Sequence, residues 1–323
     1  MRHNLLSVLL IIVSVSLQAQ RIEPIPFADF EQWAVRYIKE SAIVGGKTSV
    51  LYAVAPTDTI RTNSPFEYGK NGNIWSVSNA YAKVMGVEKG SGTLTPEYRD
   101  TTNGYCCRMD SKLEVVRALG MFDLRVLVAG TLFTGRTIEP IRTQKDPYQN
   151  IDFGVPFTQT PTALIFDYKA VISPDNTLLY AKGGVGKPKE IAGHDEGHAF
   201  VVLQRRWEDA EGNIYAERVA TGYERFKEDV PQWQNNHTLR LLYGDITTSP
   251  IYKQYTNDVK LNNVRRAMNK QGKIVPIQEV GWAKEGTLPT HVIINLSSGC
   301  YEAFVGHDGN TLWVDNLQWV FED

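Results

Sequence analysis

The stretch Thr162-Ala163-Leu164-Ile165-Phe166-Asp167-Tyr168-Lys169-Ala170-Val171-Ile172 alternates between two kinds of side chain. One set is apolar or aromatic and consists of Leu164, Phe166, Tyr168, Ala170 and Ile172, whereas the opposite set includes Asp167 and Lys169. Successive side chains of a β-strand point to opposite faces of the sheet. The period of two therefore predicts a strand with one face in an apolar core and one face that carries charges.

The same alternation recurs along most of the chain. It is found in residues 122–133, 199–207, 214–221, 237–243, 291–296 and 311–321. Turn-forming sequences such as Ser173-Pro174-Asp175-Asn176 and Asp308-Gly309-Asn310 separate these stretches. Because strands and helices do not alternate regularly, the pattern predicts an all-β protein, an antiparallel β-sandwich of the jelly-roll type with decorated loops.

A short N-terminal helix is expected over residues 29–41. Its apolar residues stand at helical spacing: Phe30, Trp33, Ala34, Tyr37 and Ile38. Asp29 can cap the helix, with Gln32 as the partner in a capping box.

Composition narrows the classes of function. The 323 residues include 34 Lys and Arg against 36 Asp and Glu, a formal net charge of −2. A nucleic-acid binder driven by electrostatics needs a surplus of positive charge, so we expect no nucleic-acid partner. Aromatic residues are plentiful, with 15 Tyr, 12 Phe and 7 Trp.

The first residues have the features of a secretory signal peptide. Arg2 and His3 precede an apolar run from Leu5 to Val13, and Ala19 is a small residue at the expected cleavage site. We expect residues 1–19 to be removed and residues 20–323 to form one domain in the periplasm or outside the cell. No cysteine lies near the cleavage site to carry a lipid, and no later segment has the length and apolarity of a membrane-spanning helix.

The three cysteines allow two interpretations. Cys106 and Cys107 are adjacent and would point to opposite faces of a strand, so at most one of them could meet Cys300. We favour three buried thiols over a single disulfide bond from Cys300 to Cys106 or Cys107.

Asp315 stands in an otherwise apolar row of the last strand, together with Trp313, Leu317, Trp319 and Phe321. A buried carboxylate needs hydrogen bonds, a counter-ion or a metal ion. One hypothesis is a structural calcium ion held by Asp315, Asp29 and Glu31, if the two ends of the chain pack together. The alternative is a carboxylate bonded to backbone amides at a bulge. No other cofactor is expected.

The tryptophans and their polar neighbours indicate saccharide recognition. A pyranose ring stacks one apolar face on an aromatic ring, while its hydroxyls bind amides, carboxylates and guanidinium groups. Candidate stacking residues are Trp75 and Trp207, and candidate hydrogen-bonding residues are Asn79, Arg108, Asp167 and Lys169. For each tryptophan, packing in the core is the competing interpretation.

Several motifs together resemble a family of exported Bacteroidetes proteins, the putative carbohydrate metabolism domain. They are Trp75-Ser76-Val77-Ser78-Asn79, Gly104-Tyr105-Cys106-Cys107-Arg108-Met109-Asp110, Gly154-Val155-Pro156-Phe157-Thr158, Phe166-Asp167-Tyr168-Lys169, Leu242-Tyr243-Gly244-Asp245, Pro289-Thr290-His291 and Gly309-Asn310-Thr311-Leu312-Trp313-Val314-Asp315-Asn316. The resemblance implies a β-jelly-roll with a pocket on its concave face, like the binding and catalytic sandwiches of glycan-degrading systems.

Three functions remain open from the sequence. The first is an exported carbohydrate-binding protein that takes part in glycan utilisation and binds an oligo- or polysaccharide. The second is a glycoside hydrolase or related enzyme, which needs two carboxylates roughly 5–9.5 Å apart in one pocket. The third is a structural or adhesion module of the cell surface. Sequence alone selects no catalytic pair and no oligomeric state.

Overall fold

The computed structural model describes residues 20–69, 72–118, 122–143, 146–262 and 265–322. Its largest sheet has ten strands, of which seven follow one another in the order β13 (Ile151–Phe153), β12 (Thr131–Thr137), β25 (His291–Ser297), β19 (Gly197–Glu208), β20 (Ile214–Phe226), β24 (Ile274–Trp282) and β23 (Arg266–Met268). The strands β14 (Val155–Pro156), β22 (Leu242–Tyr243) and β5 (Trp75–Val77) pair with members of this series. The predicted signal peptide, residues 1–19, lies outside the described residues.

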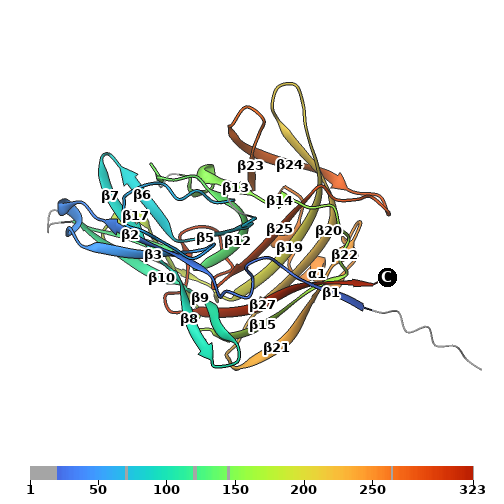
Figure 1. Cartoon of the computed structure of the whole chain (residues 1–323), viewed down its shortest axis with the longest axis horizontal. Helices are drawn as coiled ribbons and strands as arrows, with labels where there is room; N and C mark the ends of the chain where they lie inside the picture. The colour runs from blue at the N-terminus through green and yellow to red at the C-terminus, as the bar shows by residue number, and fades with distance from the viewer. Residues whose placement is uncertain (1–19, 70–71, 119–121, 144–145, 263–264, 323) are drawn as a thin grey trace, which may run out of the picture.

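A second sheet of six strands faces the first (Figure 1). Its order is β21 (Val230–Arg240), β15 (Ala163–Val171), β27 (Thr311–Glu322), β9 (Gly104–Asp110) and β8 (Leu94–Asp100), and β1 (Gln20–Pro24) pairs with β27. The pairing of β1 with β27 brings the two ends of the described chain together. Within these two sheets the strands are antiparallel except for β20 and β24, which run parallel.

The main core fills the space between the two sheets. Leu164 and Phe166 reach it from β15, and Val201 and Leu203 reach it from β19. The apolar set of the 162–172 stretch thus points inward, as the alternation predicts. The prediction of an all-β antiparallel sandwich is confirmed.

Smaller elements extend the sandwich, several of them at the left in Figure 1. They are β2 (Trp33–Lys39), β3 (Thr48–Val54), β4 (Asp58–Ile60), β6 (Ala80–Val84), β7 (Val87–Ser91), β10 (Lys112–Ala118), β11 (Phe122–Val128), β16 (Thr177–Tyr180), β17 (Lys182–Val185), β18 (Lys189–Ala192), β26 (Val305–Gly306), the 3-10 helices η1 (Ala42–Val44) and η2 (Pro147–Asn150), and the helices α1 (Pro250–Gln254) and α2 (Thr256–Val259). Among the described residues, no helix is long and apolar enough to cross a membrane.

The expected helix over residues 29–41 is wrong, because this segment is a turn followed by strand β2. Strand β2 pairs with β3 along its whole length and with β4 in parallel. Phe30 has a φ of 50°, which an α-helix does not accept. A helix would have turned Arg36 to solvent. In the structure Arg36 is buried, and its two hydrogen bonds to Glu139 offset the cost of burying its charge.

All three cysteines are free thiols in the interior, so the favoured interpretation is confirmed. Burial raises the pKa of both Cys106 and Cys300 to about 12, and it raises the pKa of Cys107 as well. These thiols are therefore protonated and unreactive at neutral pH.

Trp75 is a central residue of the core. Its side chain is 0% exposed, and its indole N–H donates to the Pro26 carbonyl at 2.8 Å. Strand β5 places it in the same apolar cluster as Leu164 and Val201.

Replacement of Trp75 by alanine is expected to lower the free energy of unfolding by about 3–5 kcal/mol, because it leaves a large cavity and an unpaired carbonyl. Denaturant unfolding measures the loss. Trp207→Ala is the matched control, since Trp207 is 43% exposed. Equal losses for the two variants would contradict the core position of Trp75.

Candidate functional site

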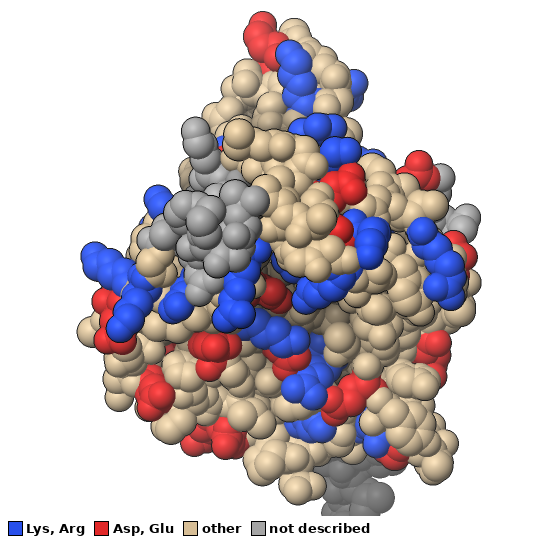
Figure 2. All heavy atoms as spheres, turned by 90° about the vertical axis from the view of Figure 1, so that its left-hand side faces the viewer, with Lys and Arg blue, Asp and Glu red and all other residues tan. Residues whose placement is uncertain are grey.

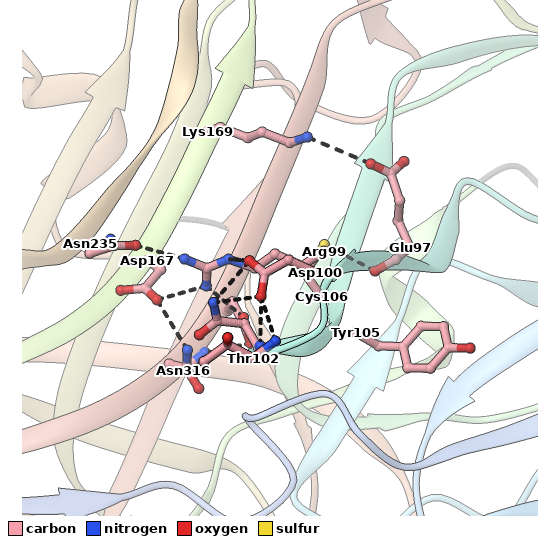
Figure 3. Close-up of polar contacts among 12 residues, drawn as sticks. Glu97, Arg99, Asp100, Thr102, Tyr105, Cys106, Asp167, Lys169, Asn235 and Asn316 are labelled. Carbon is pink, nitrogen blue, oxygen red and sulfur yellow. Dashed lines mark hydrogen bonds and ion pairs between the residues drawn. The ribbon is translucent and has the colours of Figure 1, made fainter.

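The polar set of the 162–172 stretch lies on the side of its sheet that faces away from the core. Register places Lys169 opposite Trp313 on β27, and Trp313 opposite Arg108 on β9. In the neighbouring row, Asp167 is directly opposite Asp315. We use the name charged face for the side chains that gather here from five strands, namely Glu97, Arg99, Arg108, Asp167, Lys169, Trp233, Trp313 and Asp315 (Figure 3 shows several of them).

Arg99 holds the two aspartates together. Its Nη1 is 2.8 Å from Oδ2 of Asp167 and 2.7 Å from Oδ2 of Asp315, and its Nη2 donates to Asn235 at 2.7 Å (Figure 3). Like charges directly opposite each other on neighbouring strands repel. The guanidinium group offsets this repulsion and joins β8, β15, β27 and β21.

The remaining carboxylate oxygens are also satisfied. Oδ1 of Asp167 accepts from the backbone N–H of Asn236 at 2.8 Å, and Oδ1 of Asp315 accepts from the backbone N–H of Asn316 at 2.9 Å. Asn236 and Asn316 have φ values of 55° and 52°, a conformation that asparagine tolerates better than most residues. These backbone turns aim the two N–H groups at the carboxylates.

The pKa of Asp315 is raised from 3.8 to about 7. Burial is the main cause, and the nearby charge of Asp167 adds to it, while the hydrogen bond and positive charge of Arg99 oppose it. One positive charge between two carboxylates leaves a net negative charge, so the buried carboxylate retains its proton more readily.

Two tryptophans cover the cations of the charged face. Arg99 lies 4.0 Å from the ring centre of Trp233, and Lys169 lies 4.4 Å from that of Trp313 and 5.5 Å from that of Trp233. Arg108 lies 5.3 Å from the Trp313 ring centre. Trp313 is 8% exposed, whereas Trp233 is only half-buried, so Trp233 is the ring that a ligand can reach.

Glu97 connects the aromatic and basic side chains. It accepts hydrogen bonds from Trp313 Nε1 and Arg108 Nη1, each at 2.9 Å, and its carboxylate is 3.6 Å from Lys169 Nζ. Burial alone would raise the pKa of Glu97, but these two hydrogen bonds and the positive charges hold it below its usual value. Glu97 is therefore a carboxylate at neutral pH, and it is partly exposed.

The structure brings together only some of the residues predicted from the sequence. Arg108, Asp167 and Lys169 lie on the charged face, and Asp315 joins them. Trp75 and Asn79 are internal, and the Asn79 side chain bonds to backbone groups of Tyr52, Thr93 and Leu94. In this structure neither can touch a ligand in solvent. Trp207 lies apart on the β19–β20 hairpin, stacked on Tyr215.

Sequence reasoning missed Arg99 and Trp233, on which this face depends. Strand β8 contains Pro96 and has an irregular register between Tyr98 and Asp100, so its alternation is weak. In β21, the spacing of Trp233 and Asn235 two residues apart was a usable signal, because both point to the same side of a strand.

The three residues expected to bind calcium do not form a ligand set. Asp29 is exposed, and Glu31 accepts from the backbone N–H of Tyr105 at 2.8 Å. The described residues contain no group of three His, Cys, Asp or Glu side chains arranged to hold a metal ion. Arg99 is the cation that Asp315 binds.

Two cavities of the structure are elsewhere. One, of about 700 Å³, adjoins η1 and β10, and another, of about 480 Å³, adjoins α1 and α2. None of the residues predicted to bind saccharide lines either of them.

Replacement of Arg99 by alanine is expected to destabilise the protein by about 3–5 kcal/mol, because two buried carboxylates lose their counter-ion. Urea unfolding at pH 8 measures this loss. The triple variant Arg99→Ala, Asp167→Asn, Asp315→Asn should recover much of it, since no buried charge remains. A triple variant no more stable than Arg99→Ala would contradict the electrostatic explanation.

Asp315 should also make stability depend on pH. Its pKa is higher in the folded state than in the unfolded chain, so its contribution is fully present below pH 4 and is lost as the pH rises towards 7. The stability of wild type relative to Asp315→Asn should therefore fall between pH 4 and pH 7. Asp29→Asn, at an exposed site, is the control. A difference between wild type and Asp315→Asn that does not change with pH would refute the raised pKa.

Comparison with known proteins gives three findings. No curated protein matches the chain. A structure titled as a putative glycoside hydrolase from Bacteroides thetaiotaomicron VPI-5482 is 14% identical, with 86% of this chain and 76% of that chain covered and a TM-score of 0.44. Another, titled as a putative glycoside hydrolase from Bacteroides vulgatus ATCC 8482, is 15% identical, with 92% and 94% covered and a TM-score of 0.42. Both similarities are too distant to indicate function. The model of the family called putative carbohydrate metabolism domain matches residues 52–320, and the chain belongs to this family.

Proposed function

We propose that this protein binds an oligo- or polysaccharide at the charged face and does so after export, in glycan utilisation. The observation that carries the proposal is the half-buried ring of Trp233 beside Lys169 and Arg99, with Glu97 and Asn235 within the same network. An aromatic ring next to carboxylate, amide and cationic groups suits a sugar, which has one apolar face and a rim of hydroxyls.

The polar groups of the charged face are already held in place. Glu97 is bonded to Arg108 and Trp313, and Asn235 is bonded to Arg99. A ligand that meets pre-positioned partners loses less binding energy to side-chain ordering. This supports a binding role for the face.

The charges of the face nearly balance, which suits a neutral saccharide. Three cations (Arg99, Arg108 and Lys169) stand beside three acids (Glu97, Asp167 and Asp315), and Asp315 shares its site with a proton near neutral pH. A strongly charged polymer would gain little from such a surface.

A glycoside hydrolase is the second candidate. The Oδ2 atoms of Asp167 and Asp315 are 2.8 and 2.7 Å from the same nitrogen, so they are at most 5.5 Å apart, the sum of those distances. Retaining glycosidases place their two carboxyl groups about 5–5.5 Å apart, and their acid has a raised pKa. However, the Asp315 side chain is 0% exposed and both acids bind Arg99, so a sugar cannot reach them without rearrangement. Binding is therefore the better-supported function.

Saccharide binding by the mature chain tests the proposal. Calorimetric titration against neutral plant, host and microbial glycans should identify a ligand, and Trp233→Ala should weaken its binding by roughly tenfold, because loss of ring stacking is worth about 1 kcal/mol or more. Trp207→Ala, another partly exposed tryptophan, should bind as wild type does.

Three outcomes would overturn the proposal. They are the absence of binding to every glycan, loss of binding in Trp207→Ala with none in Trp233→Ala, and release of reducing ends that Asp167→Asn and Asp315→Asn both abolish. The first would show that the ligand is not a saccharide. The second would show that the binding site is on the β19–β20 hairpin, and the third would show that the protein is a hydrolase.

A further inference from the structure

The cavity of about 700 Å³ lies between η1 and the antiparallel ribbon formed by β10 and β11. We call it the basic groove and define it by Ile43, Lys47, Lys89, Val115, Arg117 and Arg125, which are among its lining residues. Figure 2 looks at this end of the molecule and shows Lys and Arg side chains around the centre of the face, with Asp and Glu side chains among them. None of the lining residues is acidic.

Arg125 is the residue that points most directly to a ligand. Its Nε is buried and has no hydrogen-bond partner among the described residues. The Arg125 side chain as a whole is only part-buried and lines the groove, so a bound carboxylate or sulfate would give its guanidinium group an acceptor. Lys47, on the same lining, is exposed, so its ammonium group is open to a ligand from solvent.

Lys89 is held at the groove by a buried acid. Its ammonium group is 2.8 Å from Glu40, which also accepts from the Ser49 hydroxyl. Glu40 is buried and does not line the groove, and its Oε1 atom is the one that contacts Lys89 and Ser49. The lining contains basic residues and no acidic one, so an anion is the ligand that it favours.

Apolar walls accompany these cations. Register places Val115 directly opposite Arg125 on the β10–β11 ribbon, and Ile43 of η1 is on the other wall. Val115 is 43% exposed and Ile43 is 39% exposed. A ligand for this groove should combine an anionic group with a body that has apolar C–H surface.

We propose that the basic groove binds the carboxylate or sulfate of an acidic saccharide, such as a hexuronic acid or a sulfated hexose. A guanidinium group binds a carboxylate or sulfate through two parallel hydrogen bonds, and the C–H face of the sugar ring packs on Val115 and Ile43. The inference rests on the proposed function, because it takes the ligand to be a saccharide.

The test compares matched pairs of probes on the full mature chain. Oligogalacturonate is compared with its methyl ester, and dextran sulfate with dextran, so that the two members of each pair share a sugar backbone and differ in charge. We expect the acid of at least one pair to bind at least tenfold tighter than its neutral partner, with an affinity that falls as salt is added. The pair that shows this preference distinguishes carboxylate from sulfate.

Variants locate the binding. Arg125→Ala and Lys47→Ala should each weaken binding of the acidic saccharide by roughly tenfold, the effect of one charge-assisted hydrogen bond. Thermal unfolding checks that both variants fold. Lys284→Ala removes a positive charge at an exposed site outside the groove and should have no effect.

Equal affinity for the acid and neutral members of both pairs would overturn the inference, and so would an equal loss in Lys284→Ala. Poly-glutamate bound as tightly as the acidic saccharide would also overturn it, in favour of an acidic peptide. Failure here is separable from failure of the proposed function, because neutral glycans should still bind and should still depend on Trp233. Conversely, the protein could bind the acidic saccharide through Arg125 and bind no neutral glycan. That result would refute binding at the charged face and leave the basic groove supported.

Discussion

The outward side of the six-stranded sheet depends on the ion pairs of Arg99. Arg99 lies between two carboxylates that the register of β15 and β27 places directly opposite each other. It also bonds to Asn235 and supports the ring of Trp233, both on β21. A buried ionic cluster is often no more stabilising than apolar residues of the same size. Its effect here is on register, because a shift of one residue in β15 or β27 would turn an aspartate into the core and remove one of the two carboxylates that pair with Arg99.

The fold was predictable where the signal was local. The alternation in residues 162–172 gave β15 almost to its ends, and it placed Asp167 and Lys169 on one face. The prediction for the segment around β2 was wrong because apolar residues at 33, 34, 37 and 38 also fit a helix. The buried Arg36 pairs with Glu139, which is 103 residues away in the chain. Such a partner cannot be found from a local pattern. The same holds for Arg99, whose strand joins the site only through the sheet order.

The residues of the family motifs have two roles: some stabilise the core, and others lie on the charged face. Asn79 bonds to backbone groups on both sides of it, and Trp75 fills the core, so this first motif stabilises the fold. Arg108, Asp167, Lys169 and Trp313 instead share one outward face. Residue type alone did not separate the two groups, since a tryptophan beside an asparagine suits both a core and a sugar site. The facing of each side chain, set by strand pairing, decides between them.

The two candidate sites differ in the range of their electrostatic fields. On the charged face each cation lies within hydrogen-bonding or ion-pairing distance of an acid, so the fields largely cancel a few ångströms away. In the basic groove the lining residues include no acid, although Lys89 is paired with the buried Glu40, and a surface charge acts over about 8 Å in a physiological salt solution. If both proposals hold, a saccharide with acidic units would first be attracted by the groove, whereas the charged face would act only on contact, through ring stacking and short hydrogen bonds. The two proposals thus place attraction and shape recognition on different surfaces of one chain, and they require that salt weaken the first without weakening the second.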